Sequence, residues 1–275
     1  VLRHTFEQEV QTVDLPVLVT SVRQALAEKH LQIYLNDPIT ADLLAEAGLD
    51  GALQTNEGDF LMVVDANLGF NKASALVERK VAHTVRLALD GSAEVDTRLT
   101  YTHTAPAQTR PCSQTSRYDP VYEQNMVRCY WNYGQLLVPT TAKLVQGPHQ
   151  VVEGQYLLRA EPTSGQIDEA VQPGHKMSWG QLFLLPPAEQ VTLDYRYSLP
   201  AGTAQLNSDT WSYNLYLQKQ PGTLTTEVEV MIFLPPGTQL EHSYPAPTTE
   251  QDGKLTFDFS LQTDKHLSVT YHHKD

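Results

Sequence analysis

The stretch Arg110–Pro139, RPCSQTSRYDPVYEQNMVRCYWNYGQLLVP, changes along its length from an irregular loop to a buried strand. Pro111, Pro120 and many Ser, Thr, Asp and Asn residues indicate the loop, because these residue types favour turns over regular structure. Met126–Val138 is rich in Val, Tyr, Trp and Leu, which is the composition of a strand buried on at least one face. That strand should end at Pro139, which has no backbone N–H to donate to a sheet.

Both cysteines of the chain, Cys112 and Cys129, lie near the two ends of this loop. A long loop in a compact domain is usually functional, disordered or tied down, and a disulfide between these residues would tie it. Such a bond would stabilise the fold by about 3 kcal/mol, mostly by restricting the unfolded chain. Two buried free thiols are the alternative. Because disulfides persist outside the reducing cytosol, the first interpretation predicts an extracytoplasmic protein, either secreted or at the cell surface.

The composition of the 275-residue chain limits its partners. Its 19 Lys and Arg residues stand against 32 Asp and Glu residues, which gives a net charge of −13. No basic cluster is present to neutralise phosphates, so we predict no nucleic-acid partner, and an anionic membrane surface is disfavoured for the same reason. No apolar run is long enough to span a bilayer, and we therefore expect membrane contact only through an anchor upstream of Val1.

The N-terminal part of the chain alternates helical and strand patterns. Apolar residues recur at helical spacing over Pro16–Lys29, which predicts an amphipathic helix with one apolar face directed to a core. A short strand over Leu31–Leu35 and a second helix that begins after Asp37 follow, and the apolar run Phe60–Val64 predicts a buried strand. We therefore interpret residues 1–75 as the closing part of an α/β domain.

From Val77 onward the hydrophobic period changes to two. Val77–Leu89 and Ala93–His103 flank the hairpin signal Asp90-Gly91 and predict a two-stranded ribbon. Alternation places Val77, Arg79, Val81, His83 and Val85 on one face of the first strand. Further strands are predicted at Gln155–Ala160, Gln181–Leu185, Gln190–Ser198, Ser212–Gln218, Thr225–Phe233, Lys254–Leu261 and His266–His272.

The predicted fold class is therefore α+β, with a helix-containing α/β portion followed by an antiparallel, Ig-like β-sandwich. We expect three units, namely residues 1–75, a β-sheet unit with the tied loop over 76–147, and a β-sandwich over 148–275. Three apolar strands end on proline, at Pro139, Pro186 and Pro235. Because proline cannot donate to a ladder, we predict that the chain switches sheets at these corners.

Two of the predicted strands are candidates for exposed sheet edges. Lys254–Leu261 alternates apolar and polar residues and carries one charge, Asp258, on its outward face, and the strand that begins at His266 is similarly regular. Exposed edges can pair with another chain, so we expect self-association by β-edge pairing or cover by another part of a longer protein. An ordinary solvated edge protected by Asp258 and Lys265 is the alternative.

One turn has the spacing of a cation loop. Asp65, Asn67 and Asn71 offer oxygen ligands on either side of Gly69, and hard cations prefer such oxygens. The alternative is a structural turn in which Lys72 neutralises Asp65. The sequence contains no hydrolase nucleophile elbow, no His-Glu-x-x-His, no phosphate-binding Gly-rich loop and no CxxC, so we predict no catalytic residue and no cofactor.

Aromatic residues gather on and beside the tied loop. Tyr118, Tyr122, Trp131 and Tyr133 could form a platform on which a sugar ring or a partner protein stacks. Packing of these side chains in the core is the alternative. The first interpretation predicts a contact with a cell-envelope glycan or with a surface protein.

Several segments together resemble a known family. They are Ala27–Tyr34 (AEKHLQIY), Leu49–Gly51, Val63–Lys72 (VVDANLGFNK), Val138-Pro139, Trp179-Gly180 and Tyr213–Gly222 (YNLYLQKQPG). In this order they resemble the C-terminal half of the bacterial domain-of-unknown-function family 4012. The turns Asn67–Lys72 and Gln218–Gly222 are the most specific of these segments. The resemblance implies a membrane-anchored, extracytoplasmic protein whose α/β portion is similar to enzymes that attach glycopolymers to cell walls.

Two functions are compatible with these observations. The first is a non-enzymatic extracytoplasmic module of a bacterial cell-surface protein, with a role in display, spacing or assembly at the cell envelope. The second is the accessory, glycan-binding half of an enzyme that handles cell-wall glycopolymers.

Overall fold

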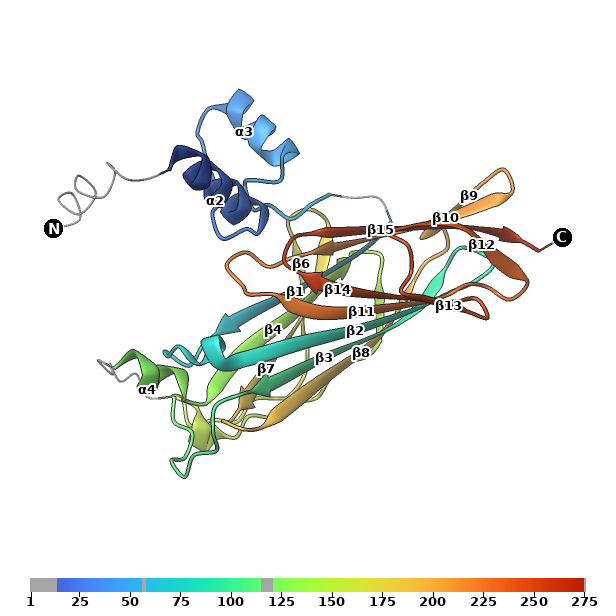
Figure 1. Ribbon diagram of the computed structural model, residues 1–275. Coiled ribbons are helices and arrows are strands. Elements are labelled where there is room, and N and C mark those ends of the chain that lie inside the picture. The colour runs from blue at the N-terminus through green and yellow to red at the C-terminus, as the bar shows by residue number, and fades with distance from the viewer. Residues whose placement is uncertain (1–13, 56–57, 115–120, 275) are drawn as a thin grey trace.

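The computed structural model describes residues 14–55, 58–114 and 121–274. Two mixed β-sheets pack face to face, and the few helices lie at the periphery (Figure 1). The predicted combination of a helical N-terminal part and a β-sandwich is confirmed in outline, although the helical part is minor. None of the described helices is long and apolar enough to cross a membrane.

We name the two sheets A and B. In the described part of the chain, sheet A contains eight strands in the spatial order β12 (Thr238–Tyr244), β15 (Lys265–His273), β10 (Thr210–Gln218), β1 (Asp59–Asn67), β4 (Tyr130–Pro139), β7 (Lys176–Leu185) and β6 (Asp168–Gln172), with β9 (Ala204–Asn207) paired to β10. Sheet B contains seven in the same described residues, in the order β13 (Thr249–Gln251), β14 (Lys254–Leu261), β11 (Thr226–Phe233), β2 (Val77–Leu87), β3 (Ala93–His103), β8 (Gln190–Leu199) and β5 (Lys143–Gln146). The helical elements are α2 (Leu15–Ala27), α3 (Pro38–Glu46), α4 (Tyr122–Met126) and the short 3₁₀ turns η2 (Ala73–Leu76) and η3 (Gly154–Tyr156).

The chain contains two halves in which four strands visit the two sheets in the same order. In the first half β1, β2, β3 and β4 lie in sheets A, B, B and A, and in the second half β10, β11, β14 and β15 lie in A, B, B and A. The halves meet where β1 pairs with β10 and β2 pairs with β11, and both pairs are parallel. The expectation of an antiparallel sandwich was therefore wrong at this junction, because equivalent strands of two halves with one path run in the same direction.

One continuous core lies between the sheets and runs from Leu61 to Tyr271 along the chain. Strand β3 illustrates its origin, since buried and more exposed residues alternate along it as the sequence pattern predicts. Strand β1, from the range expected to close an α/β domain, lies at the centre of sheet A. The core thus includes residues from all three of the expected units, 1–75, 76–147 and 148–275.

The proline corners are confirmed. β4 ends in sheet A at Pro139 and β5 follows in sheet B, and β7 in sheet A precedes β8 in sheet B across Pro186. β11 in sheet B precedes β12 in sheet A across Pro235. A proline at these positions ends the ladder because it has no N–H to donate.

The N-terminal helices differ from the prediction in their packing. α2 has Pro16 in its first turn, and α3 begins after Asp37, whose side chain accepts a hydrogen bond from the Thr40 N–H. Neither helix, however, contains a buried residue, so the apolar face expected to contact the core is exposed. The segment attaches to the sandwich through the residues after α2, where Lys29 is buried and pairs with Asp264 at 2.7 Å.

Two predicted strands are absent from the described residues. Leu31–Leu35 has no strand structure, and residues 155–160 contain the end of η3 and irregular backbone. Both segments lie outside the two sheets, so no neighbouring strand is available to satisfy their backbone groups in a ladder.

The predicted edge strands are interior strands. β14 pairs with β11 and β13, and β15 pairs with β10 and β12. The edges are instead β6 and β12 in sheet A and β5 and β13 in sheet B. Two of these are short, and β12 carries a bulge between Leu240 and His242, which are features that discourage pairing with another chain. Of these four described edges, β6 has neither feature, so we expect self-association by edge pairing to use β6 first.

Candidate functional site

The largest of the prominent hollows lies where the two halves join. The connection from β1 to β2 and the connection from β10 to β11 both pass from sheet A to sheet B, and they lie side by side. Together with α4 they line a partly open cavity of about 900 Å³, which we name the corner cavity. Its lining includes Asp65, Lys72, Arg79, Tyr122, Tyr130 and Gln220. This volume is in the range of small-molecule sites.

A buried ion pair forms the floor of the corner cavity. The Arg79 guanidinium of β2 donates to the Asp65 carboxylate of β1, and their side chains are 8% and 16% exposed. The same carboxylate accepts hydrogen bonds from Tyr101 Oη at 2.8 Å and Asn132 Nδ2 at 2.7 Å. Buried charges need such partners, because removal from water costs several kcal/mol for each ion.

Two further contacts bind the second half to this floor. Arg79 Nη2 donates to Thr226 Oγ1 at 3.0 Å. The Gln220 side chain accepts from the Asp65 N–H and donates to the Asp65 carbonyl, both at 2.9 Å, as a neighbouring strand would. The floor is therefore a fixed network that spans both halves. Within the described residues, Arg79 Nε has no hydrogen-bond partner, so the guanidinium keeps one unused donor.

Arg79 and Tyr101 keep their protons over the physiological pH range. Burial lowers the pKa of Arg79, but the Asp65 charge and hydrogen bond outweigh burial, and the net pKa is raised. Burial first, and then the Asp65 charge, raise the pKa of Tyr101 well above its usual value. Tyr101 thus remains a hydrogen-bond donor to Asp65 over the physiological pH range.

Two of the three residues of the possible cation loop, Asn67 and Asn71, hold the connection from β1 to β2 in shape. Asn67 Oδ1 accepts from the Gly69 N–H at 2.9 Å, and Asn67 Nδ2 donates to Asn71 Oδ1 at 3.0 Å. Asn71 Oδ1 also accepts from the Ala73 N–H. Asp65 pairs with Arg79 instead of the expected Lys72. Among the described residues no group of three or more His, Cys, Asp or Glu side chains is placed to hold a metal ion.

The structure separates the aromatic residues that were expected to form a platform. Tyr118 lies outside the described residues. Trp131 is 1% exposed and donates its indole N–H to the Tyr156 carbonyl, so its ring is a core group. Tyr133 donates to Asp168 Oδ2 at 3.0 Å across the outer side of sheet A. Tyr122 is 54% exposed and lines the corner cavity.

The predicted disulfide between Cys112 and Cys129 is confirmed, with a Cα–Cα distance of 5.6 Å. The disulfide is linked to the connection from β1 to β2, because Asn71 Nδ2 donates to the Cys129 carbonyl at 2.9 Å. Gln114 Nε2 likewise donates to the Leu68 carbonyl at 3.0 Å. The disulfide thus holds the loop that carries α4 next to the corner cavity.

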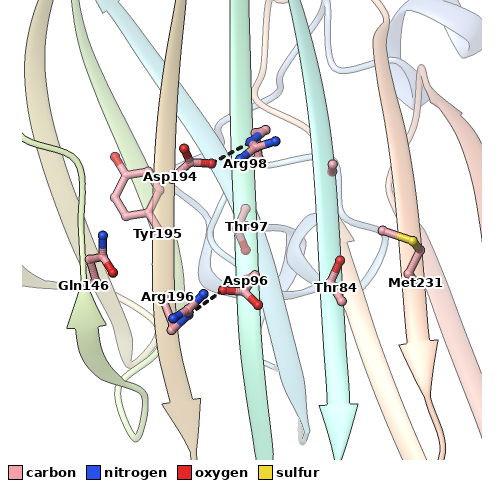
Figure 2. A pocket seen from close by; sticks show the side chains of 10 residues that line it. Thr84, Asp96, Thr97, Arg98, Gln146, Asp194, Tyr195, Arg196 and Met231 are labelled. Carbon is pink, nitrogen blue, oxygen red and sulfur yellow. Dashed lines mark hydrogen bonds and ion pairs between the residues drawn. The ribbon is translucent and has the colours of Figure 1, made fainter.

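A second hollow, of about 410 Å³, lies on the outer face of sheet B. Figure 2 shows two ion pairs across strands β3 and β8, Arg98 with Asp194 and Arg196 with Asp96, both at 2.7 Å. Three of the side chains are solvent-exposed and Asp96 is half-exposed, and pairs of this kind contribute about 0–1 kcal/mol each. The charges of this smaller hollow satisfy one another at the surface, whereas the corner cavity is larger and has a buried ion pair, so the corner cavity is the stronger candidate site.

Comparisons with known proteins add little at this distance. No protein-family model matches the chain, and no curated protein matches it. Among solved structures, a candidate nutrient binding protein from Legionella pneumophila is 10% identical, with a TM-score of 0.40 over 78% of this chain and 71% of that one. An M1 zinc metallopeptidase from Deinococcus radiodurans is 13% identical, with a TM-score of 0.31 over 71% of this chain and 42% of that one. Neither likeness carries a functional argument.

Proposed function

We propose that this chain is a non-enzymatic extracytoplasmic module of a bacterial cell-surface protein, with a role in display, spacing or assembly at the cell envelope. The disulfide between Cys112 and Cys129 is the observation that carries this proposal, because structural disulfides are typical of proteins that mature outside the cytosol. The resemblance to family 4012 agrees with it. The two most specific segments of that resemblance, Asn67–Lys72 and Gln218–Gly222, include the corner connections beside the cavity.

The redox state of the cysteines tests the proposed extracytoplasmic location. We expect that the protein, exported to an oxidising compartment and denatured without reductant, shows no alkylated cysteine by intact mass. Prior reduction should give two alkylated cysteines in the same measurement. Replacement of both residues by serine should lower the free energy of unfolding by about 2–4 kcal/mol, because the unfolded chain gains freedom. Two alkylated cysteines in the unreduced exported protein would contradict the proposal.

A second candidate function is the accessory, glycan-binding half of a cell-wall glycopolymer-handling enzyme. The exposed Tyr122 at the rim of the corner cavity favours it, because an exposed aromatic ring beside polar groups suits stacking against a sugar. A retention experiment tests this function. The pure protein is passed over insoluble cell-wall glycan and over an inert resin that carries no glycan. An equal, negligible retention on both would remove it.

A further inference from the structure

The corner cavity is close to electrically neutral although the whole chain is strongly acidic. Its lining contains three negative and three positive side chains, which are Asp65, Glu78, Glu227, Lys72, Arg79 and Lys80. Asp65 and Arg79 neutralise each other in the floor. The net charge of −13 on the chain would repel an anionic ligand, and the cavity has no excess of basic side chains to compensate. An uncharged ligand therefore fits better.

The remaining lining groups suit a ligand with many hydroxyls. The connection from β10 to β11 contributes Gln220, Thr223 and Thr225 to the lining, the start of β11 contributes Thr226, and η2 contributes Ser74. These side chains donate and accept hydrogen bonds in both directions, as sugar hydroxyls require. Gln220 and Thr226 are already fixed by the floor network, so binding loses little side-chain entropy at these residues.

Tyr122 supplies an aromatic surface to the same cavity. It belongs to α4, which packs against η2 and accepts a hydrogen bond from the Lys72 N–H at the Asn125 carbonyl, 3.2 Å away. The position of α4 is thus set by the connection from β1 to β2 and by the disulfide-tied loop. An exposed aromatic face beside hydroxyl and amide groups is the arrangement that places the C–H face of a sugar against a ring.

We propose that the corner cavity binds a neutral saccharide, with Tyr122 as the stacking surface and the connection from β10 to β11 as the source of hydrogen bonds. This inference rests on the second candidate function and names the site and ligand class for it. The charge balance disfavours a polyanionic chain in the same cavity, and we therefore expect neutral and anionic oligosaccharides to give opposite outcomes in one experiment.

The test is calorimetric titration of the full chain with a neutral oligomer of N-acetylglucosamine, a neutral oligomer of glucose and an anionic oligomer of galacturonate. We expect one of the neutral oligomers to bind. Tyr122→Ala should weaken binding at least tenfold. Ala75→Trp should abolish it, because Ala75 is an exposed residue of the cavity lining and the indole would fill the space without removing a side-chain hydrogen bond. Tyr34→Ala is the matched control, since Tyr34 is 82% exposed and lies outside the cavity, and its affinity should be unchanged.

Three results would overturn the inference, provided that the variants unfold at the same temperature as the parent chain. They are no binding of either neutral oligomer, binding of the anionic oligomer alone, and neutral binding that Ala75→Trp leaves intact. The last result would leave the second candidate function standing with its site elsewhere. A failure of retention on insoluble cell-wall glycan would remove that function itself.

Discussion

Arg79→Met is expected to lower the free energy of unfolding by about 3 kcal/mol or more, because it leaves the Asp65 carboxylate in the floor of the corner cavity without its cation. Methionine keeps most of the volume of the side chain, so a packing defect contributes little. Thr226 Oγ1 also loses its donor from Arg79. Urea titration gives the change as a shift of the midpoint at constant slope.

Arg98→Met is the matched control for this prediction. Arg98 also pairs with an aspartate at 2.7 Å, Asp194, but the two side chains are 63% and 57% exposed. Its loss should cost less than about 1 kcal/mol, because solvent already screens the pair. Adding Asp65→Asn to Arg79→Met should recover part of the stability, since the amide still accepts from Tyr101 and carries no charge. Equal effects of Arg79→Met and Arg98→Met would contradict a buried ion pair.

The second large effect concerns pH and a buried pair between the sheets. Asp59 of β1 is 0% exposed, accepts from Tyr213 Oη at 2.7 Å, and lies 4.0 Å from His83 Nε2 of β2. His83 Nδ1 is 2.8 Å from Thr97 Oγ1. Burial raises the pKa of Asp59 from 3.8 to about 6, against the opposing hydrogen bonds of Tyr213 and Phe60 and the charge of Lys176. Burial lowers the pKa of His83 from 6.5 to about 3.

These two shifts change stability in opposite directions as the pH falls. Asp59 has a folded-state pKa above its unfolded value, so its contribution is fully present below pH 3.8 and is lost as the pH rises through about 6. His83 has a folded-state pKa below its unfolded value, so its contribution is present above pH 6.5 and is lost as the pH falls toward 3. Between pH 4 and pH 6 the folded chain holds a proton on Asp59 while the unfolded chain holds one on His83, and the two effects nearly cancel.

Single replacements should reveal the cancellation. When the pH falls from 6.5 to 4.5, the unfolding free energy of Asp59→Asn should fall by about 2 kcal/mol relative to that of the parent chain. Only the destabilising protonation of His83 in the unfolded chain then remains. His83→Gln should gain about 2 kcal/mol relative to the parent over the same interval, because only Asp59 remains. Other carboxylates titrate alike in all three proteins, so the difference from the parent isolates the pair. Parallel curves of stability against pH for the three proteins would contradict the assignment.

The sequence alone predicts local features well in this chain. The ribbon was expected at Val77–Leu89 and Ala93–His103, and the structure has β2 over Val77–Leu87 and β3 over Ala93–His103. The proline corners and the disulfide are likewise confirmed. Each of these depends on residues close in sequence, namely the alternation along a strand, a missing N–H, or two cysteines at the ends of one loop.

The sequence could indicate only part of the candidate site. Alternation places Arg79 and His83 on the inward face of β2, and an ionisable side chain on a buried face requires a partner. That signal could have marked both residues as members of buried networks. It does not name Asp65, Thr226 or Asp59. Asp65 and Asp59 lie on β1 in the facing sheet and Thr226 lies on β11, and the placement of both strands relative to β2 is decided elsewhere in the chain.

By itself the sequence determined most of the long core strands, which face of each is apolar, where sheets are exchanged and which cysteines pair, but it missed the shorter strands β5, β6, β9, β12 and β13. Only the tertiary structure decided that β1 and β10 run parallel, that β14 and β15 are interior strands, and that the apolar face of α2 contacts no core. A strand pattern records how much of each face is buried, but any strand of matching length can satisfy the backbone groups at its edge. The neighbour is therefore chosen by the fit of the whole sandwich, and the corner cavity exists because that choice sets two distant connections side by side.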